Sequence, residues 1–232
     1  MTASRRFFCD TAMGQVHGVA AGSGAGAPLV LLHQIPRSVD EFKEVQPLLA
    51  QHRRTIALDN PGYGCSDPVE GQPTVADYAR AVVDVLDALH IDQAVFVGHH
   101  TGALVAIEIA AAFPERVDRV VLSGPVCTDA EGRIELSKFF KQWTVQEDGS
   151  HLKEKWDRFH QWIPDPALVQ RITLDLWRAG ETSEQGHFAA ALYRMEDRLG
   201  LVKCPALLVY GKHDPFADPV RAKPIRDAFK PS

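Results

Sequence analysis

The fold is decided by the stretch Ala94-Val95-Phe96-Val97-Gly98-His99-His100-Thr101-Gly102-Ala103-Leu104. It opens with a short apolar run that is typical of a strand buried on both faces, and the small apolar residues of 101–113 predict a helix. A strand that passes so directly into a helix needs a very tight turn, whose tip residue has a strained backbone and whose neighbours two positions away must be small. Gly98 and Gly102 meet that requirement, which places His100 at the tip.

A side chain at such a tip stands at the end of the sheet, beside a helix N-terminus that favours developing negative charge. Imidazole can attack an acyl group or take a proton from water, because its ordinary pKa is near 6.5. His100 is therefore a candidate nucleophile, general base or substrate ligand. For His99 we expect a packing position just under the turn, with a substrate contact as the alternative.

The segments on both sides of this turn alternate between strand and helix patterns. Strands are predicted, after an N-terminal hairpin at 5–9 and 15–20, at 29–33, 55–58, 94–97, 119–122 and 206–210, and helices at 39–50, 75–89, 101–113 and 219–229. Alternating strands and helices of these lengths imply right-handed crossovers and a parallel sheet. The predicted fold class is α/β, with a mostly parallel sheet flanked by helices.

One long segment interrupts this alternation. Residues 128–198 show only helical patterns, at 134–143, 151–162, 167–177 and 187–199. We expect a core of residues 1–127 and 199–232 and a helical cap, or lid, of residues 128–198 over the carboxyl edge of the sheet. Most cap aromatic residues should pack between helices, while Trp143 and Trp162 are candidates for a substrate contact. His151, His160 and His187 lack metal-ligand spacing and are expected at the surface or in the cap.

Bulk composition excludes several classes of partner. The 232 residues carry a formal net charge of −5, with 45% hydrophobic and 24% charged residues, which argues against nucleic acid and anionic membranes as partners. No apolar run is long enough to span a bilayer, and no signal peptide is evident. The four cysteines are scattered, as in a reduced cytoplasmic protein, and no metal or cofactor is expected. The glycine cluster at 22–26 precedes a strand rather than a helix, so it is not a phosphate loop.

Three further motifs complete a family pattern. They are Leu32-His33-Gln34-Ile35-Pro36, Asp59-Asn60-Pro61-Gly62-Tyr63-Gly64-Cys65-Ser66-Asp67 and Gly211-Lys212-His213-Asp214. Together with 98–102, and in this order, they resemble the His-Gly-x-Pro loop, the Asp-x-Pro-Gly-x-Gly-x-Ser loop, the nucleophile turn and the acid loop of the α/β-hydrolase fold family. The chain resembles that family over essentially its whole length.

The resemblance assigns roles by position. His100 stands where the family carries a serine, aspartate or cysteine nucleophile, and Asp214 stands where the family's acid orients a histidine. The backbone N–H groups of Ile35 and Thr101 would form the oxyanion hole, with a share for Gln34. His33 would contribute to substrate binding.

The chain also departs from the family. No histidine follows His213, whereas the family carries its catalytic histidine after a further strand. Without that strand, 206–210 would be an exposed apolar edge, which suggests a truncated form of a longer protein. One hypothesis is an enzyme that hydrolyses an ester, lactone, amide or activated C–C bond of a small, partly apolar substrate. The alternatives are a non-catalytic binding protein, and a lyase or cofactor-free oxygenase that uses His100 as a base. A homodimer is one candidate assembly, and the sequence does not determine the oligomeric state.

Overall fold

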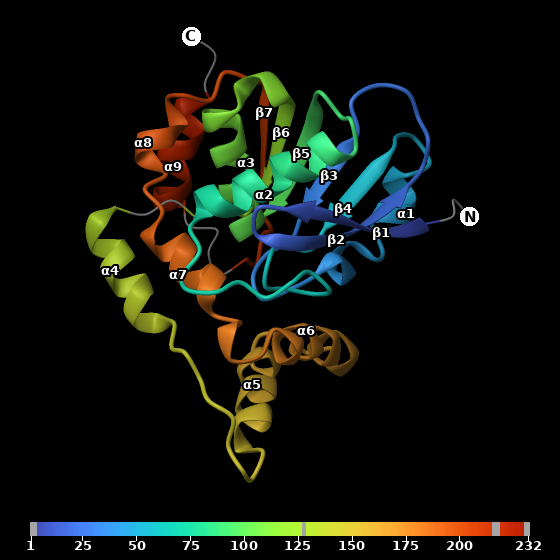
Figure 1. Cartoon of the computed structure of the whole chain (residues 1–232). Helices are drawn as coiled ribbons and strands as arrows, with labels where there is room; N and C mark the ends of the chain where they lie inside the picture. The colour runs from blue at the N-terminus through green and yellow to red at the C-terminus, as the bar shows by residue number, and fades with distance from the viewer. Residues whose placement is uncertain (1–3, 127–128, 215–218, 230–232) are drawn as a thin grey trace.

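One mixed sheet forms the centre of the protein. The computed structural model describes residues 4–126, 129–214 and 219–229, and within them seven strands lie in the order β1-β2-β4-β3-β5-β6-β7 (Figure 1). The first hairpin is antiparallel, and β2 is antiparallel to β4. The five remaining strands, β4, β3, β5, β6 and β7, are parallel, so the prediction of a mostly parallel α/β sheet is confirmed. The strands are β1 (Ser4–Thr11), β2 (Gly14–Ala21), β3 (Leu29–Leu32), β4 (Thr55–Leu58), β5 (Ala94–His99), β6 (Val117–Ser123) and β7 (Ala206–Val209).

Helices α2 (Val75–Ala88) and α3 (Thr101–Ala112) contribute many of the buried apolar side chains of the main hydrophobic core. Thr74 begins α2 with a reciprocal capping box, in which its side chain and that of Asp77 each accept the other residue's backbone N–H. Helix α3 is buried on nearly all sides, because α7 (Gln185–Leu192) and α8 (Glu196–Leu199) contact it as well as the strands. Helix α9 (Pro219–Ala228) contacts α8.

The segment between β6 and β7 is helical throughout its regular structure. It contains α4 (Ala130–Phe139), α5 (Ser150–His160), α6 (Pro166–Ala179), the 3-10 turn η3 (Gly180–Thr182), α7 and α8. Figure 1 shows α5 and α6 projecting away from the sheet, while α7 and α8 lie beside α3. The division into a core and a cap at 127/128 stays a prediction, since both of those residues lie outside the described ranges.

Two predicted helices are wrong in extent. The helix expected at 39–50 is a 3-10 turn, η1 (Val39–Phe42), followed by the single turn α1 (Gln46–Leu49), because Pro47 has no N–H to donate and its ring excludes a continuous helix. The helix expected at 187–199 is divided into α7 and α8, since Tyr193 adopts an extended backbone. The short turn η2 (Pro114–Arg116) connects α3 to β6.

Strand β7 is the last strand of the sheet on one side. The strand expected at 206–210 is present as Ala206–Val209, and two of its apolar side chains are exposed: Leu207 is 57% and Val209 is 43% exposed. Each of these side chains lacks the covering layer that the central strands have, which agrees with the prediction of an apolar edge. No described helix is long and apolar enough to cross a lipid bilayer.

Candidate active site

The turn between β5 and α3 has the predicted strained geometry. His100 lies at its tip with φ 46° and ψ −110°, outside the regions that side-chain-bearing residues favour. A Cβ on Gly98 would lie 2.2 Å from the Gly102 carbonyl oxygen, and one on Gly102 would lie 2.0 Å from the Leu32 carbonyl oxygen. Any larger residue at either position would therefore force backbone apart, and the two glycines make this turn feasible.

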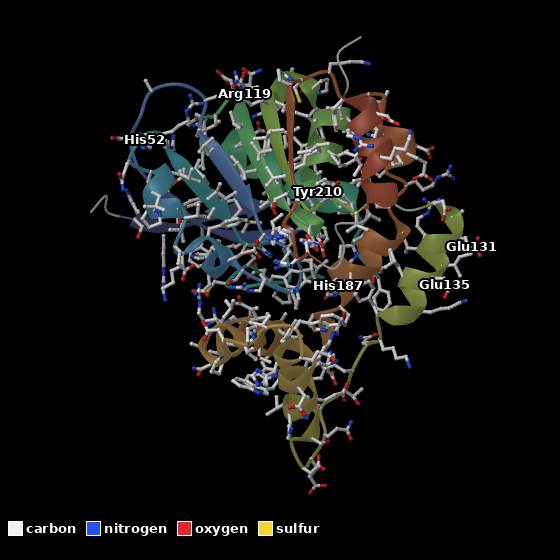
Figure 2. All side chains as sticks on the ribbon, turned by 180° about the vertical axis from the view of Figure 1, so that it is seen from behind. His52, Arg119, Glu131, Glu135, His187 and Tyr210 are labelled. Atoms are coloured by element: carbon white, nitrogen blue, oxygen red, sulfur yellow. The ribbon has the colours of Figure 1, made fainter. Side chains whose placement is uncertain are left out.

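The turn places His100 in contact with Asp214, which lies in the loop after β7. The imidazole Nε2 lies 3.0 Å from Asp214 Oδ2, and the two side chains are 17% and 12% exposed. Gly124, just after β6, makes room for this pair with φ 58°, since a Cβ there would lie 2.8 Å from Asp214 Oδ2 and 3.0 Å from His100 Nε2. Figure 2 shows many side chains gathered around this end of the sheet, below the label of Tyr210.

The surroundings of His100 favour a neutral imidazole. Burial lowers the pKa of His100, the charge of neighbouring His99 lowers it further, and Asp214 opposes both effects, with a net decrease. A carboxylate accepts hydrogen bonds and cannot donate them, so the contact with Asp214 selects the tautomer with its proton on Nε2. The lone pair that can accept a proton is then on Nδ1.

His99 is paired with a carboxylate of its own, that of Glu41. Its Nδ1 lies 2.7 Å from Glu41 Oε1, on η1, and its ring meets that of His100 edge to face, with centroids 4.6 Å apart. The His99 side chain is 33% exposed. The expected packing position under the turn is therefore wrong for His99, because it stands beside His100 at the surface of the site.

Two backbone N–H groups are expected to form an oxyanion hole, that of Thr101 at the start of α3 and that of Ile35 in the loop after β3. Ile35 and Thr101 are 4% and 6% exposed, and neither N–H donates to an acceptor within the described residues. Unsatisfied N–H groups at a helix start and a neighbouring loop are suited to an oxyanion. The share assigned to Gln34 needs correction, because its N–H already donates to Glu41 Oε2 at 3.3 Å.

The structure also corrects the assignment of His33. This side chain is fully buried, with Nδ1 2.7 Å from the Gln34 carbonyl oxygen and Nε2 accepting from the Asn60 N–H at 2.9 Å. Both ring nitrogens are engaged inside the protein, so His33 connects two loops rather than contacting a substrate.

The two tryptophan candidates differ in their environment. Trp162 follows α5 and is 68% exposed, which is typical of a surface side chain rather than of a roof over a site. Trp143 is half-buried, and its Nε1 donates to Ser183 Oγ at 2.9 Å. The prediction of a substrate contact is therefore wrong for Trp162 as the structure places it, and for Trp143 it stays a prediction.

Among the described residues, one group has ligand atoms close enough for a metal ion: His17, Asp59 and Cys65. Asp59 accepts from His17 Nδ1 at 2.7 Å, from the Cys65 N–H at 2.8 Å and from the Val39 N–H at 2.6 Å. These bonds satisfy both carboxylate oxygens without an ion. Asp59 therefore joins β2, η1 and the loop after β4 as a structural centre.

Sequence reasoning missed Glu41 and Gly124. Glu41 comes from a turn that was expected to be one regular helix, and no motif distinguishes it from other surface acids. Gly124 had a usable signal, since a glycine before Pro125 directly after a strand marks a backbone with special requirements.

A model of the alpha/beta hydrolase fold matches residues 27–232. The chain belongs to the α/β-hydrolase fold family. His100 lies at the tip of the turn after β5, at the place where the resemblance of the turn motif predicts the family's nucleophile position.

Comparison with known proteins adds relatives within this family. The chain is 43% identical to a 2-hydroxymuconate semialdehyde hydrolase of Pseudomonas sp. (strain CF600) over 44% of the chain and 38% of that protein. It is 26% identical to an uncharacterized carboxylesterase of Bacillus subtilis over 98% of the chain and 76% of that protein. The chain thus matches well under half the length of its relatives at the higher identity.

A solved structure shows the same fold. The crystal structure of the enol-lactonase from Burkholderia xenovorans LB400 superposes with a TM-score of 0.76 at 20% identity, covering 95% of this chain and 87% of that one. At this identity the likeness establishes the fold alone.

Proposed function

We propose that this protein hydrolyses an ester, lactone or similarly activated acyl bond of a small, partly apolar molecule, with His100 as general base. The observation that carries the proposal is the His100–Asp214 pair at 3.0 Å on the tip of the turn. The N–H groups of Ile35 and Thr101, which have no acceptor within the described residues, support it as the expected oxyanion donors. Base, orienting acid and oxyanion donors are the parts that acyl transfer requires.

The chemistry follows from the protonation state. Neutral His100 takes a proton from water through Nδ1 while the water oxygen attacks the acyl carbon, and the carbonyl oxygen becomes an oxyanion that accepts from Ile35 and Thr101. Asp214 stabilises the imidazolium that forms. When the tetrahedral intermediate collapses, the imidazolium returns its proton to the leaving alkoxide, so that an acid and an alcohol result and His100 is neutral again.

The relatives support the substrate class. The enol-lactonase and the semialdehyde hydrolase are named for small substrates that contain a carbonyl group. We also propose that residues 128–198 act as the cap over this site, because α7 joins the projecting helices to the sheet side of the molecule (Figure 1).

Chromogenic acyl esters and lactones of increasing chain length test the proposal. His100→Ala should lower kcat/KM by about 10²- to 10⁴-fold, the usual contribution of a general base. His100→Ser keeps a hydroxyl at the tip but has no base to activate it, so it should be as inactive as the alanine variant. Lys153→Met, on an exposed face of α5, serves as the control with unchanged activity.

A binding protein without catalysis is the rival. It predicts the same background rate in the wild type and in both His100 variants, together with saturable binding of the ester. That result would contradict the proposed hydrolase.

A further inference from the structure

Glu41 joins two parts of the candidate active site that are distant in the sequence. Its Oε1 lies 2.7 Å from Nδ1 of His99, and its Oε2 accepts from the N–H of Gln34 at 3.3 Å. His99 directly precedes the proposed base, His100, and Gln34 directly precedes Ile35, an expected oxyanion donor. One carboxylate therefore contacts the chain neighbour of each proposed catalytic group.

The turn η1, which carries Glu41, is anchored to the core. The Val39 N–H donates to Asp59 at 2.6 Å, and the Glu41 N–H donates to the Ser38 carbonyl oxygen at 3.0 Å. Phe42, the next residue, is 6% exposed and packs with apolar side chains of β3 and β4. The side chain of Glu41 thus extends from a fixed backbone, and it is only 10% exposed.

The contact with Glu41 determines which nitrogen of His99 carries the proton. A carboxylate accepts hydrogen bonds and cannot donate them, so neutral His99 has its proton on Nδ1 and its lone pair on Nε2. Without the carboxylate, both tautomers of His99 become available. Glu41 therefore fixes the tautomer of His99 as well as the orientation of its ring.

The fixed ring of His99 acts in turn on His100. The two rings meet edge to face, with an interplanar angle of 83° and centroids 4.6 Å apart. A neighbouring ring that cannot rotate limits the orientations open to His100, in the way that packing and outer hydrogen bonds hold catalytic side chains. Glu41 also acts through its charge, which raises the pKa of His100.

The second oxygen of Glu41 acts on the loop that carries Ile35. The Gln34 carbonyl oxygen accepts from the Arg37 N–H at 2.9 Å and lies 2.7 Å from Nδ1 of His33. With its N–H on Glu41, Gln34 is held through both of its backbone polar groups. Because a peptide unit is planar, a fixed Gln34 carbonyl group also fixes the direction of the Ile35 N–H.

We propose that Glu41 is a positioning residue for the hydrolysis proposed above: it holds His99 against His100 and Gln34 beside Ile35, so that the base and an expected oxyanion donor keep one relative position. The inference rests on the proposed function. Its effect on the histidine pair can nevertheless be measured without a substrate.

Kinetics with a chromogenic ester test the proposal first. Glu41→Ala should lower kcat about 10- to 100-fold and leave KM nearly unchanged, because misplaced catalytic groups weaken the binding of the transition state more than that of the substrate. Glu41→Gln should lie between this variant and the wild type, since its one carbonyl oxygen can accept from only one of the two donors. This variant keeps the side-chain volume, so it also serves if the alanine variant does not fold.

Glu44→Ala is the matched control. It removes a nearby acid that is 66% exposed and paired with Arg171, and its kcat should equal that of the wild type. Unchanged kcat in both Glu41 variants would overturn the proposal, and so would an equal loss in Glu44→Ala.

NMR of the imidazole nitrogens gives a second readout that needs no turnover. Neutral His99 should have its proton on Nδ1 in the wild type and in Glu44→Ala, whereas Glu41→Ala should show both tautomers. The same tautomer in Glu41→Ala and the wild type would overturn the proposal. A wild type without hydrolytic activity would instead refute the proposed hydrolysis, since the tautomers of His99 would still show whether Glu41 holds the histidine pair.

Discussion

At the scale of single residues, two neighbours of His100 shift its pKa in opposite directions. Asp214 raises the pKa of His100 and His99 lowers it, while burial sets the net decrease. The proposed base must be neutral, so kcat/KM should fall at low pH along a limb that reports the pKa of His100 in the free protein. Each neighbour can therefore be examined through the position of that limb.

Asp214→Asn removes the charge that stabilises the imidazolium. The pKa of His100 should decrease further, and the acid limb of kcat/KM should move to lower pH than in the wild type. An acid limb that stays in place or moves to higher pH would show that Asp214 does not act on the group that controls activity.

His99→Gln removes a charge that lowers the pKa of His100. The acid limb should therefore move to higher pH, opposite to the Asp214→Asn shift. Glu41, left without its histidine, acts in the same direction, because its negative charge also raises the pKa of His100. Equal limbs in this variant and the wild type would contradict the electrostatic coupling of the two histidines.

At the scale of elements, the strand–turn–helix unit depends on small residues for steric reasons. Gly98→Ala should lower the free energy of unfolding by about 3 kcal/mol or more, because the new Cβ would lie 2.2 Å from backbone. Gly200→Ala is the matched control: it has ordinary helical dihedrals and no atom within 4 Å of its Cβ position, so its change should stay within about 0.5 kcal/mol. Urea denaturation measures both, and similar values would refute the steric argument.

The same unit shows which elements can be predicted from residues that are close together in the sequence. The apolar strand, the two glycines and the small-residue helix predicted β5, the turn and α3 to within one or two residues, because each depends on short-range sterics. The prediction of one helix at 39–50 was wrong. Its apolar spacing is typical of a helix, but it does not take account of Pro47 or of the hydrogen bond from the Val39 N–H to Asp59.

At the scale of the whole molecule, a buried ion pair joins the helical segment to the core. Arg37, in the loop after β3, donates to Asp175 Oδ2 at 2.9 Å, and Ser38 Oγ donates to Asp175 Oδ1 at 2.7 Å. The side chains of Arg37 and Asp175 are 6% and 9% exposed. Helix α6 is thereby held at the loop that carries Ile35.

Asp175→Ala should cost about 3–5 kcal/mol, because it leaves Arg37 buried without its main partner. Glu44→Ala removes a carboxylate that is 66% exposed from its pair with Arg171, and should cost no more than about 1 kcal/mol. Unfolding by urea, followed together with limited proteolysis of α5 and α6, compares the two. Comparable losses would mean that the buried pair does not hold the segment in place.

The sequence by itself determined the order of strands and helices, the sharp turn at His100, the apolar edge at 206–210 and the family to which the chain belongs. These features follow from residues near one another in the chain, where periodicity and steric size are sufficient. Only the tertiary structure placed Asp214 beside His100, Glu41 beside His99 and His33 inside the protein. Those outcomes depend on side chains distant in sequence that meet through packing, and no local pattern encodes where a side chain ends or which partner it finds there.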